Sequence, residues 1–339
     1  MVQGAEMFDY AKGLEQQEQS RGERFRIGVG MGVGAHGNGM FGVMPDLTAI
    51  IIKMNEDGSL VMYSGVHEMG VSAITTQVQL VSGILGVTLD RIECVYGDTD
   101  LTPYQLADYS SRGIFVNANA AAHCATKMRE ELSLYAAELM ECEQDLIEFR
   151  DNHAFYKHHS SSLADIAAHA RHKHDREIIA ELTFASEGLV TSYGAHFAKV
   201  QVDTETGNVV ILDYVAVHDV GKAINPLSVE GQIEGAIHMG IGYALMESLE
   251  FDEKGKIMNS SFRQYRIPHA CDMPKSIRIG LVEKLEIAGP YGAKGIGECA
   301  IVPSICAIAN AVSNAVDREF NNLPIKPADV LKALACPLE

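Results

Sequence analysis

The residues whose types and spacing best suit catalysis lie in GPYGAKGIGECA, residues 289–300, where four glycines flank Lys294 and Glu298 before an apolar helical pattern. A carboxylate on a glycine loop at the start of a helix can be held rigidly with one face open. Partial burial of such a group raises its pKa toward the range of a general base. The structural alternative is an ion pair between Glu298 and Lys294, with Glu298 stabilising the helix N-terminus. These residues alone favour the structural alternative.

Other catalytic motifs are absent from the sequence, including GxxxxGK[ST], GxSxG and HExxH. The segment RIGVGMGVGAHGNGMFG, residues 26–42, holds seven glycines and has a GxGxxG-like spacing, but no ribose-binding acid is suitably placed. Glycine at this density predicts a backbone that approaches a neighbour closely or turns tightly.

A short internal repeat links LVMYSGVHEMG, residues 60–70, with VILDYVAVHDVG, residues 210–221. Both copies end a strand pattern with V-H-acid-x-G and lead into a helical pattern, which makes a duplicated strand–loop–helix unit plausible. Backbone N–H groups at helix N-termini bind anions, so two such units could hold a phosphate-bearing cofactor from two sides. Two ordinary glycine turns are the alternative, and the repeat alone favours it.

Six histidines fall in the polar segment 143–192, with the spacings HH and HxxHxH. The spacings lack convergent carboxylates or cysteines, so we interpret the histidines as the solvated face of a hairpin and a helix. No metal site is predicted there.

Composition narrows the class of protein. The 339 residues carry a formal net charge of -18, which disfavours binding to nucleic acid or to an anionic membrane. The N-terminus has no secretory signal, and the longest apolar stretch carries glutamates and glycines, so no membrane span is predicted. The seven cysteines are scattered and form no CxxC, which indicates a reducing cytoplasm without disulfides, iron–sulfur or zinc ligands in this chain.

Strand and helix patterns are mixed along the chain without strict alternation, which predicts an α+β fold. The clearest strand patterns are residues 47–54 and 208–217. The clearest helical patterns are residues 73–86, 115–143, 229–249 and 300–320.

Four ordered motifs identify a family. GVHEMGVSAITTQVQLVSGILGV, DYSSRGIFVNANAA, VHDVGKAINPLSVEGQIEGAIHMGIGYAL and GPYGAKGIGECAIVPSICAIANAV follow one another as in the molybdenum hydroxylases. The chain therefore resembles the molybdenum-binding subunits of the xanthine dehydrogenase/aldehyde oxidoreductase family. The similarity runs from about Gly22 to about Leu334 and thins over 143–192.

The resemblance implies the C-terminal half of the family's molybdopterin-binding region, built from two related strand–loop–helix subdomains. Subdomain A would span 26–190, with the His-rich segment 143–192 at its end. Subdomain B would span 191–339 and carry the glutamate loop. A polar N-terminal arm, 1–25, would precede them.

The resemblance also assigns roles to single residues. Glu298 matches the catalytic general base. The expected substrate contacts are His36 and Phe41, with Asn38 beside them. The expected cofactor contacts are Met69, Gly70, Ser110, Ser111, Arg112, Gly113, Gln232 and Lys294. No residue is expected to ligate molybdenum directly, because the cofactor holds the metal in this family.

The implied reaction is hydroxylation of an electron-poor carbon of an N-heterocycle, of the nicotinate or purine/xanthine type, with oxygen derived from water. The implied cofactor is molybdopterin with molybdenum, in its cytosine dinucleotide form. An aldehyde oxidoreductase or a subunit similar to hydroxybenzoyl-CoA reductase is the enzymatic alternative. A scaffold subunit that only holds the cofactor is the non-enzymatic one.

Departures from the family pattern suggest a divided enzyme. Val71 replaces a glutamine that often helps to bind the cofactor, and Cys299, interpreted as a packed residue, replaces a common proline. The first half of the family's molybdenum-binding region has no counterpart here. The start at Met1 and the polar arm favour a split gene over a fragment, as in nicotinate dehydrogenases. We therefore expect three partners in the cytoplasm: a large molybdopterin subunit, an iron–sulfur subunit with 2Fe–2S clusters, and an FAD subunit.

Overall fold

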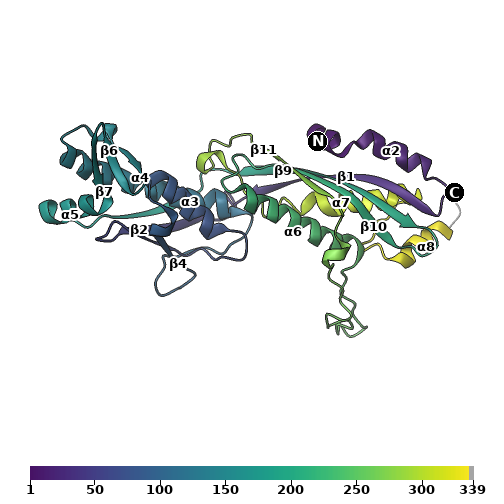
Figure 1. Ribbon diagram of the computed structural model, residues 1–339. Helices are drawn as coiled ribbons and strands as arrows, with labels where there is room; N and C mark the ends of the chain where they lie inside the picture. Colours follow the sequence, from purple (N-terminus) through teal and green to yellow (C-terminus); the bar gives the residue numbers. More distant parts are fainter. Residues whose placement is uncertain (336–339) are drawn as a thin grey trace. The chain divides into compact units, whose positions relative to one another are not determined.

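Two four-stranded sheets, each covered by helices, form the two units of the chain (Figure 1). The computed structural model describes residues 1–335, and the last four residues of the expected subdomain B lie outside the described residues. Unit 1 comprises residues 1–36, 191–284 and the chain from 296 onward, and unit 2 comprises 37–190 and 285–295. The α+β class is confirmed. The division differs from the expected boundaries, because the N-terminal segment joins unit 1 and residues 285–295 join unit 2.

The sheet of unit 1 has the strand order β1-β9-β10-β11, in which β9 and β10 are antiparallel and β10 and β11 are parallel. Helix α6 connects the two parallel strands, as a crossover of this kind requires. The elements are α1 (Val2–Phe8), α2 (Tyr10–Gln19), β1 (Phe25–Asn38), β9 (Val190–Asp203), β10 (Val209–Asp219), α6 (Pro226–Leu245), β11 (Ile277–Val282), α7 (Val302–Val316) and α8 (Pro327–Ala335).

The N-terminal segment that we expected to be a polar arm folds as helices α1 and α2. Phe8 is 2% exposed, and its ring lies 5.8 Å from the ring of Phe197 on β9. A side chain at Gly4 would collide with the same ring. The burial of Phe8 anchors these helices to one face of the sheet, and the polar residues remain on their outer side.

Alternation along the strands separates the two faces of this sheet, because successive side chains of a strand point to opposite sides. Ala195 and Phe197 pack with Phe8 under α1. Ala198 and Val200 pack on the other face, in the larger core that contains α6 and α7. The sheet of unit 1 is therefore covered by helices on both faces.

The glycine-rich segment forms β1, and its glycines line one face of the strand. Side chains at Gly28, Gly30, Gly32 and Gly34 would each collide with α7 or its first residues, mostly with backbone atoms. The facing helix positions are spaced by four residues, at Pro303, Ala307, Ala311 and Ala315. The predicted close approach is thus a seam in which a strand backbone lies against a helix backbone, and we call it the glycine seam.

Replacing Gly30 with valine tests the seam. A Cβ at this position would overlap the carbonyl of Ala307 and the amide of Ala311. Such overpacking is expected to lower the free energy of unfolding by about 1–3 kcal/mol or more. Urea unfolding measures the loss. Gly235→Ala on α6 is the matched control, because its Cβ would meet nothing within 4 Å and alanine favours the helix. Equal effects of the two variants would contradict the seam.

The sheet of unit 2 has the order β4-β3-β2-β8, with β3 and β4 parallel and the other pairs antiparallel. Its main elements are β2 (Leu47–Met54), β3 (Leu60–Ser64), α3 (Ala73–Leu85), β4 (Ile92–Tyr96), the π-helical turn η2 (Gly113–Asn117), α4 (Ala118–Met140) and β8 (Ile179–Ala185). Short β5 (Glu148–Arg150), β6 (His153–Tyr156) and β7 (His159–Ser162) make a small sheet beside α5 (Leu163–His174).

The internal repeat corresponds to a shared topology. In unit 2 a hairpin leads into a helix and a parallel strand, β2–β3–α3–β4, and in unit 1 the same order recurs as β9–β10–α6–β11. The prediction of two related strand–loop–helix subdomains is confirmed.

Among residues 1–335, none of the helices is both long and apolar enough to cross a bilayer.

Candidate functional site

Glu298 lies in a tight turn that leads into α7. The amide of Ala300 donates to the carbonyl of Ile296, and the amide of Ile301 donates to the carbonyl of Glu298, both at 3.3 Å. Cys299 is fully buried in the core of unit 1, as expected for a packed residue, whereas the side chain of Glu298 is 52% exposed. The turn hydrogen bonds and the buried Cys299 therefore fix the backbone of Glu298, while its carboxylate is exposed.

His36 is the neighbour of this carboxylate. Its Nε2 lies 3.7 Å from Oε2 of Glu298, and its side chain is 27% exposed. This separation is too long for a hydrogen bond but close enough for electrostatic coupling when the ring is protonated. The glycine seam explains the pairing, because it holds the end of β1 against the start of α7. His36, expected to face substrate, thus lies beside the expected base.

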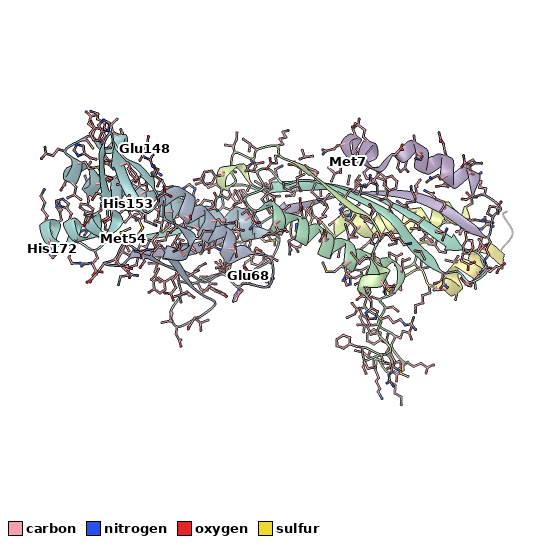
Figure 2. The ribbon with its side chains drawn as sticks, viewed as in Figure 1. Met7, Met54, Glu68, Glu148, His153 and His172 are labelled. Carbon is pink, nitrogen blue, oxygen red and sulfur yellow. The ribbon has the colours of Figure 1, made fainter. Side chains whose placement is uncertain are left out.

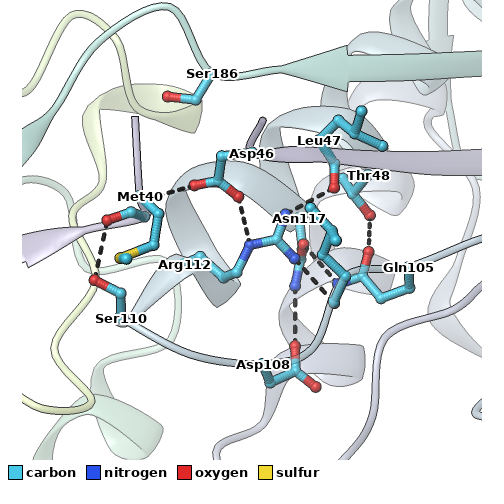
Figure 3. A network of polar contacts seen from close by, with 12 residues as sticks. Met40, Asp46, Leu47, Thr48, Gln105, Asp108, Ser110, Arg112, Asn117 and Ser186 are labelled. Carbon is cyan, nitrogen blue, oxygen red and sulfur yellow. Dashed lines mark hydrogen bonds and ion pairs between the residues drawn. The ribbon is translucent and has the colours of Figure 1, made fainter. Parts of the chain in front are cut away.

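The loop before α4, which we call the serine loop, carries Ser110 and Ser111, both with left-handed backbone (φ 47° and 49°). The amide of Gly39 donates to the carbonyl of Ser110 at 2.7 Å, and the hydroxyl of Ser110 donates to the carbonyl of Gly39 at 3.0 Å (Figure 3). This loop opens directly into η2 and α4. Backbone amides at the start of a long helix favour a bound anion, so the loop suits a diphosphate.

Arg112 supports this loop through buried hydrogen bonds. Its fully buried guanidinium donates from Nε to Asp46 Oδ1 at 2.8 Å and from Nη2 to the carbonyl of Leu47 at 2.8 Å (Figure 3). Asp46 also accepts the amide of Met40 at 2.7 Å. Because the guanidinium is enclosed by these acceptors, the Arg112 side chain positions Ser110 and Ser111, and the cofactor contact expected of Arg112 stays a prediction for its backbone.

Met69 and Gly70 lie on the exposed loop between β3 and α3. Met69 is 62% exposed, and Gly70 has φ 89° with open space where a side chain would be. Glu68, labelled in Figure 2, accepts the amides of Gly70, Ser72 and Ile74 at 2.9–3.1 Å. The carboxylate of Glu68 therefore already accepts hydrogen bonds from the amides at the start of this helix. We had expected those amides to hold a cofactor phosphate.

Asp108 connects this loop to the serine loop, and sequence reasoning missed it. Its Oδ2 lies 3.0 Å from His67 Nδ1 and accepts the amide of His67 at 3.2 Å, while Oδ1 accepts from Asn117 at 3.3 Å. The only sequence signal is its position two residues before the serine pair, next to Tyr109. Asp46 was missed as well, because nothing in MPD marks it as the partner of a residue on another element.

The glycine loop that precedes Glu298 packs backbone to backbone against the serine loop. The amide of Gly295 donates to Oδ1 of the fully buried Asn38 at 2.9 Å, and a side chain at Gly295 would overlap the carbonyl of Ser111. Asn38 thus braces this loop, and its expected place near the substrate stays a prediction. Lys294 is half-buried in the same loop, and Phe41 is 44% exposed.

The second repeat copy also binds its turn amides with side-chain oxygens, but a separate residue caps its helix. Asp219 accepts the amide of Gly221 at 3.3 Å, and Asn225 accepts the amide of Ser228 at 3.2 Å to cap α6. Gln232 lies on the second turn of α6, half-buried. In both copies, carboxylate or amide side chains of the chain itself accept hydrogen bonds from the backbone amides of the turn.

His218 of the second copy is buried rather than exposed. Its Nε2 lies 2.7 Å from Nε2 of the buried His196, whose Nδ1 lies 3.0 Å from the hydroxyl of Tyr214, and that hydroxyl donates to the carbonyl of Ser304 at 3.5 Å. Burial lowers the pKa of His218 to about 4 and that of His196 as well, so both rings are neutral near pH 7. All three donors are satisfied if His218 carries its proton on Nε2 and His196 on Nδ1. The pair is structural.

Comparison with known proteins gives concordant matches. The family profile described as "Molybdopterin cofactor-binding domain" matches residues 3–274. The putative xanthine dehydrogenase molybdenum-binding subunit of Escherichia coli K12 is 29% identical over 96% of this chain and 44% of its own length. The nicotine 6-hydroxylase large subunit of Paenarthrobacter nicotinovorans is 28% identical over 97% of this chain and 43% of its own.

Solved structures agree with the sequence matches. The crystal structure of quinoline 2-oxidoreductase from Pseudomonas putida 86 superposes with a TM-score of 0.90 at 25% identity, covering 98% of this chain and 45% of that chain. The chain thus spans somewhat less than half the length of the relatives that it matches.

Proposed function

The chain belongs to the molybdopterin cofactor-binding domains of the molybdenum hydroxylase family, and from this membership we propose that it is one part of a divided molybdenum hydroxylase. In this proposal it holds part of the cofactor and supplies the general base, Glu298. The observation that carries the proposal is the exposed carboxylate of Glu298 on a fixed turn, 3.7 Å from His36. A base needs this combination of a rigid position and an open face.

The backbone geometry of unit 2 supports a cofactor site. In unit 2, left-handed Ser110 and Ser111 precede a long helix, and Gly70 faces open space. We assign backbone contacts to the serine loop, Arg112 and Gly113, and side-chain contacts to Gln232 and Lys294. Met69 and Gly70 would lie beside the cofactor, since the amide of Gly70 already donates to Glu68. Molybdopterin, proposed in its cytosine dinucleotide form, supplies redox exchange and oxygen transfer when bound. This chain's own part is to hold the cofactor, take a proton on Glu298 and exclude water.

We propose an N-heterocycle as substrate. The relatives described above are named for xanthine, nicotine and quinoline, which are electron-poor heterocycles. An aldehyde remains the second candidate. We also propose a partner chain that carries the rest of the site, together with iron–sulfur and FAD subunits, because relatives are named as a molybdenum-binding subunit and as a large subunit of larger enzymes. The scattered cysteines of the described residues, which form no disulfide, favour a reducing cytoplasm.

Purification of the tagged chain from its native cells tests this function. We expect a co-purifying chain with the first-half motifs of the family, molybdenum close to stoichiometric, cytosine nucleotide released by acid, and hydroxylation of nicotinate or xanthine with ¹⁸O from labelled water. Turnover of aldehydes but not heterocycles would move the assignment to the second candidate. A tagged chain without molybdenum or pterin would overturn the proposal.

A further inference from the structure

The His-rich segment contains an arrangement that its spacing did not predict. Glu138 lies near the end of α4, and His169 and His174 lie on α5. Nε2 of His169 is 3.0 Å from Glu138 Oε2, and Nε2 of His174 is 2.7 Å from the same oxygen. All three atoms fall within 4.8 Å of one another. The convergent carboxylate that we considered missing comes from a different helix.

Local structure fixes where these histidines lie. Ser162 and Asp165 form a capping box that sets the start of α5, and Asp175, with left-handed backbone, ends the helix directly after His174. Ile166 and Ala170 are buried, which turns His169 toward α4. The cluster thus lies in the last turns of α5, where the helix dipole favours a cation.

From this geometry we propose that Glu138, His169 and His174 form a binding site for a divalent metal ion of the zinc class. Two imidazole nitrogens and one carboxylate oxygen are ligands that zinc prefers, and a fourth position stays open to water. Ligand atoms of a tetrahedral zinc site lie roughly 3.3 Å apart. Small side-chain rotations that lengthen the two nitrogen–oxygen distances by a few tenths of an ångström would make room for the ion. It would join α4 to α5 within unit 2.

The surroundings suit ligation. The His169 side chain is 14% exposed and those of His174 and Glu138 are 31% exposed, so the site is sheltered but reachable. The ring of Tyr135 lies 5.2 Å from that of His174 and limits its motion.

Lys173 competes with the ion. Its ammonium lies 3.4 Å from Glu138 Oε2, and its side chain is 60% exposed, so it can swing into solvent when a metal arrives. In the metal-free protein, a ring that donates through Nε2 to Glu138 must move that proton to Nδ1, or release it, before Nε2 can ligate. The same contacts would also serve an ion cluster without metal, which is the competing outcome.

Zinc titration of the EDTA-treated full chain tests the site. We expect one tightly bound zinc per chain, and Co²⁺ in its place should give the intense visible bands of a tetrahedral site. His169→Gln and His174→Gln should each weaken zinc binding by more than the roughly 10–100-fold typical of losing an outer partner of a ligand. Lys173→Gln should strengthen binding, because it removes the competing cation.

His172→Gln is the matched control. His172, labelled on α5 in Figure 2, is exposed and lies outside the cluster, so its replacement should leave the affinity unchanged. Circular dichroism checks that each variant is folded. If the double variant H169Q/H174Q binds zinc as tightly as the unmodified chain, or if Co²⁺ gives only weak octahedral bands, the three residues are an ion cluster and the proposal is overturned.

Discussion

Turnover of the assembled enzyme is expected to fall by roughly 10²–10⁴-fold or more when Glu298 is replaced by glutamine. Glutamine keeps the shape of the side chain and its place on the turn before α7, but it cannot take a proton near pH 7. The carboxylate side chain is 52% exposed, so folding and molybdenum content should remain nearly normal. Steady-state kinetics and metal analysis of the same preparation separate these two effects.

Two further variants sharpen this result. Glu253→Gln removes an exposed carboxylate of unit 1 that is not among the proposed site residues, so it should leave kcat unchanged. His36→Gln keeps the base but removes its neighbour, so it should lower kcat far less than Glu298→Gln does. Retained activity in the Glu298→Gln enzyme would remove Glu298 from the chemistry. Loss of molybdenum in that variant would show that the carboxylate acts mainly in assembly.

The second large effect is on stability. Replacing Asp46 with asparagine, or Arg112 with methionine, should each lower the free energy of unfolding by about 3–5 kcal/mol, because each change leaves one partner of a buried ion pair unsatisfied. Both side chains of the pair are 0% exposed. The serine loop rests on Arg112, so the cofactor content of the surviving folded protein should fall as well. Urea unfolding and molybdenum analysis measure the two losses.

Matched comparisons identify the cause. Arg150→Gln breaks the exposed pair with Glu148, whose side chains are 60% and 76% exposed, and should cost no more than about 1 kcal/mol. The double variant D46L/R112M removes both charges and should lose less stability than the sum of its single changes. Additive losses, or a small loss for Asp46→Asn alone, would contradict the assignment of Arg112 as a charged brace.

Much of the secondary structure was predictable from local patterns. The strand 47–54 matches β2, the helix 73–86 matches α3 within one residue, and the helix 300–320 contains α7. These elements carry strong apolar periodicity, and periodicity is a property of consecutive residues. Glu298 could be proposed as the base for a similar reason, since the family motif around it is contiguous. The long strand β1 was not predicted, because its burial depends on glycines whose partner, α7, lies more than 260 residues later.

The pairing of charges depended on the tertiary structure alone. Asp46 and Arg112 are 66 positions apart, Asp108 and His67 are 41 apart, and Glu138 lies 36 positions from His174. Each side chain by itself is an ordinary polar residue, and its role follows from whichever opposite charge the packing of helices and strands brings within 3 Å. The sequence therefore determined many of the elements and the family, and it supplied Glu298 as the proposed base. The fold decided that the Arg112 side chain pairs with Asp46, that His36 lies beside Glu298, and that two histidines meet a carboxylate, because such contacts arise from the packing of separate elements.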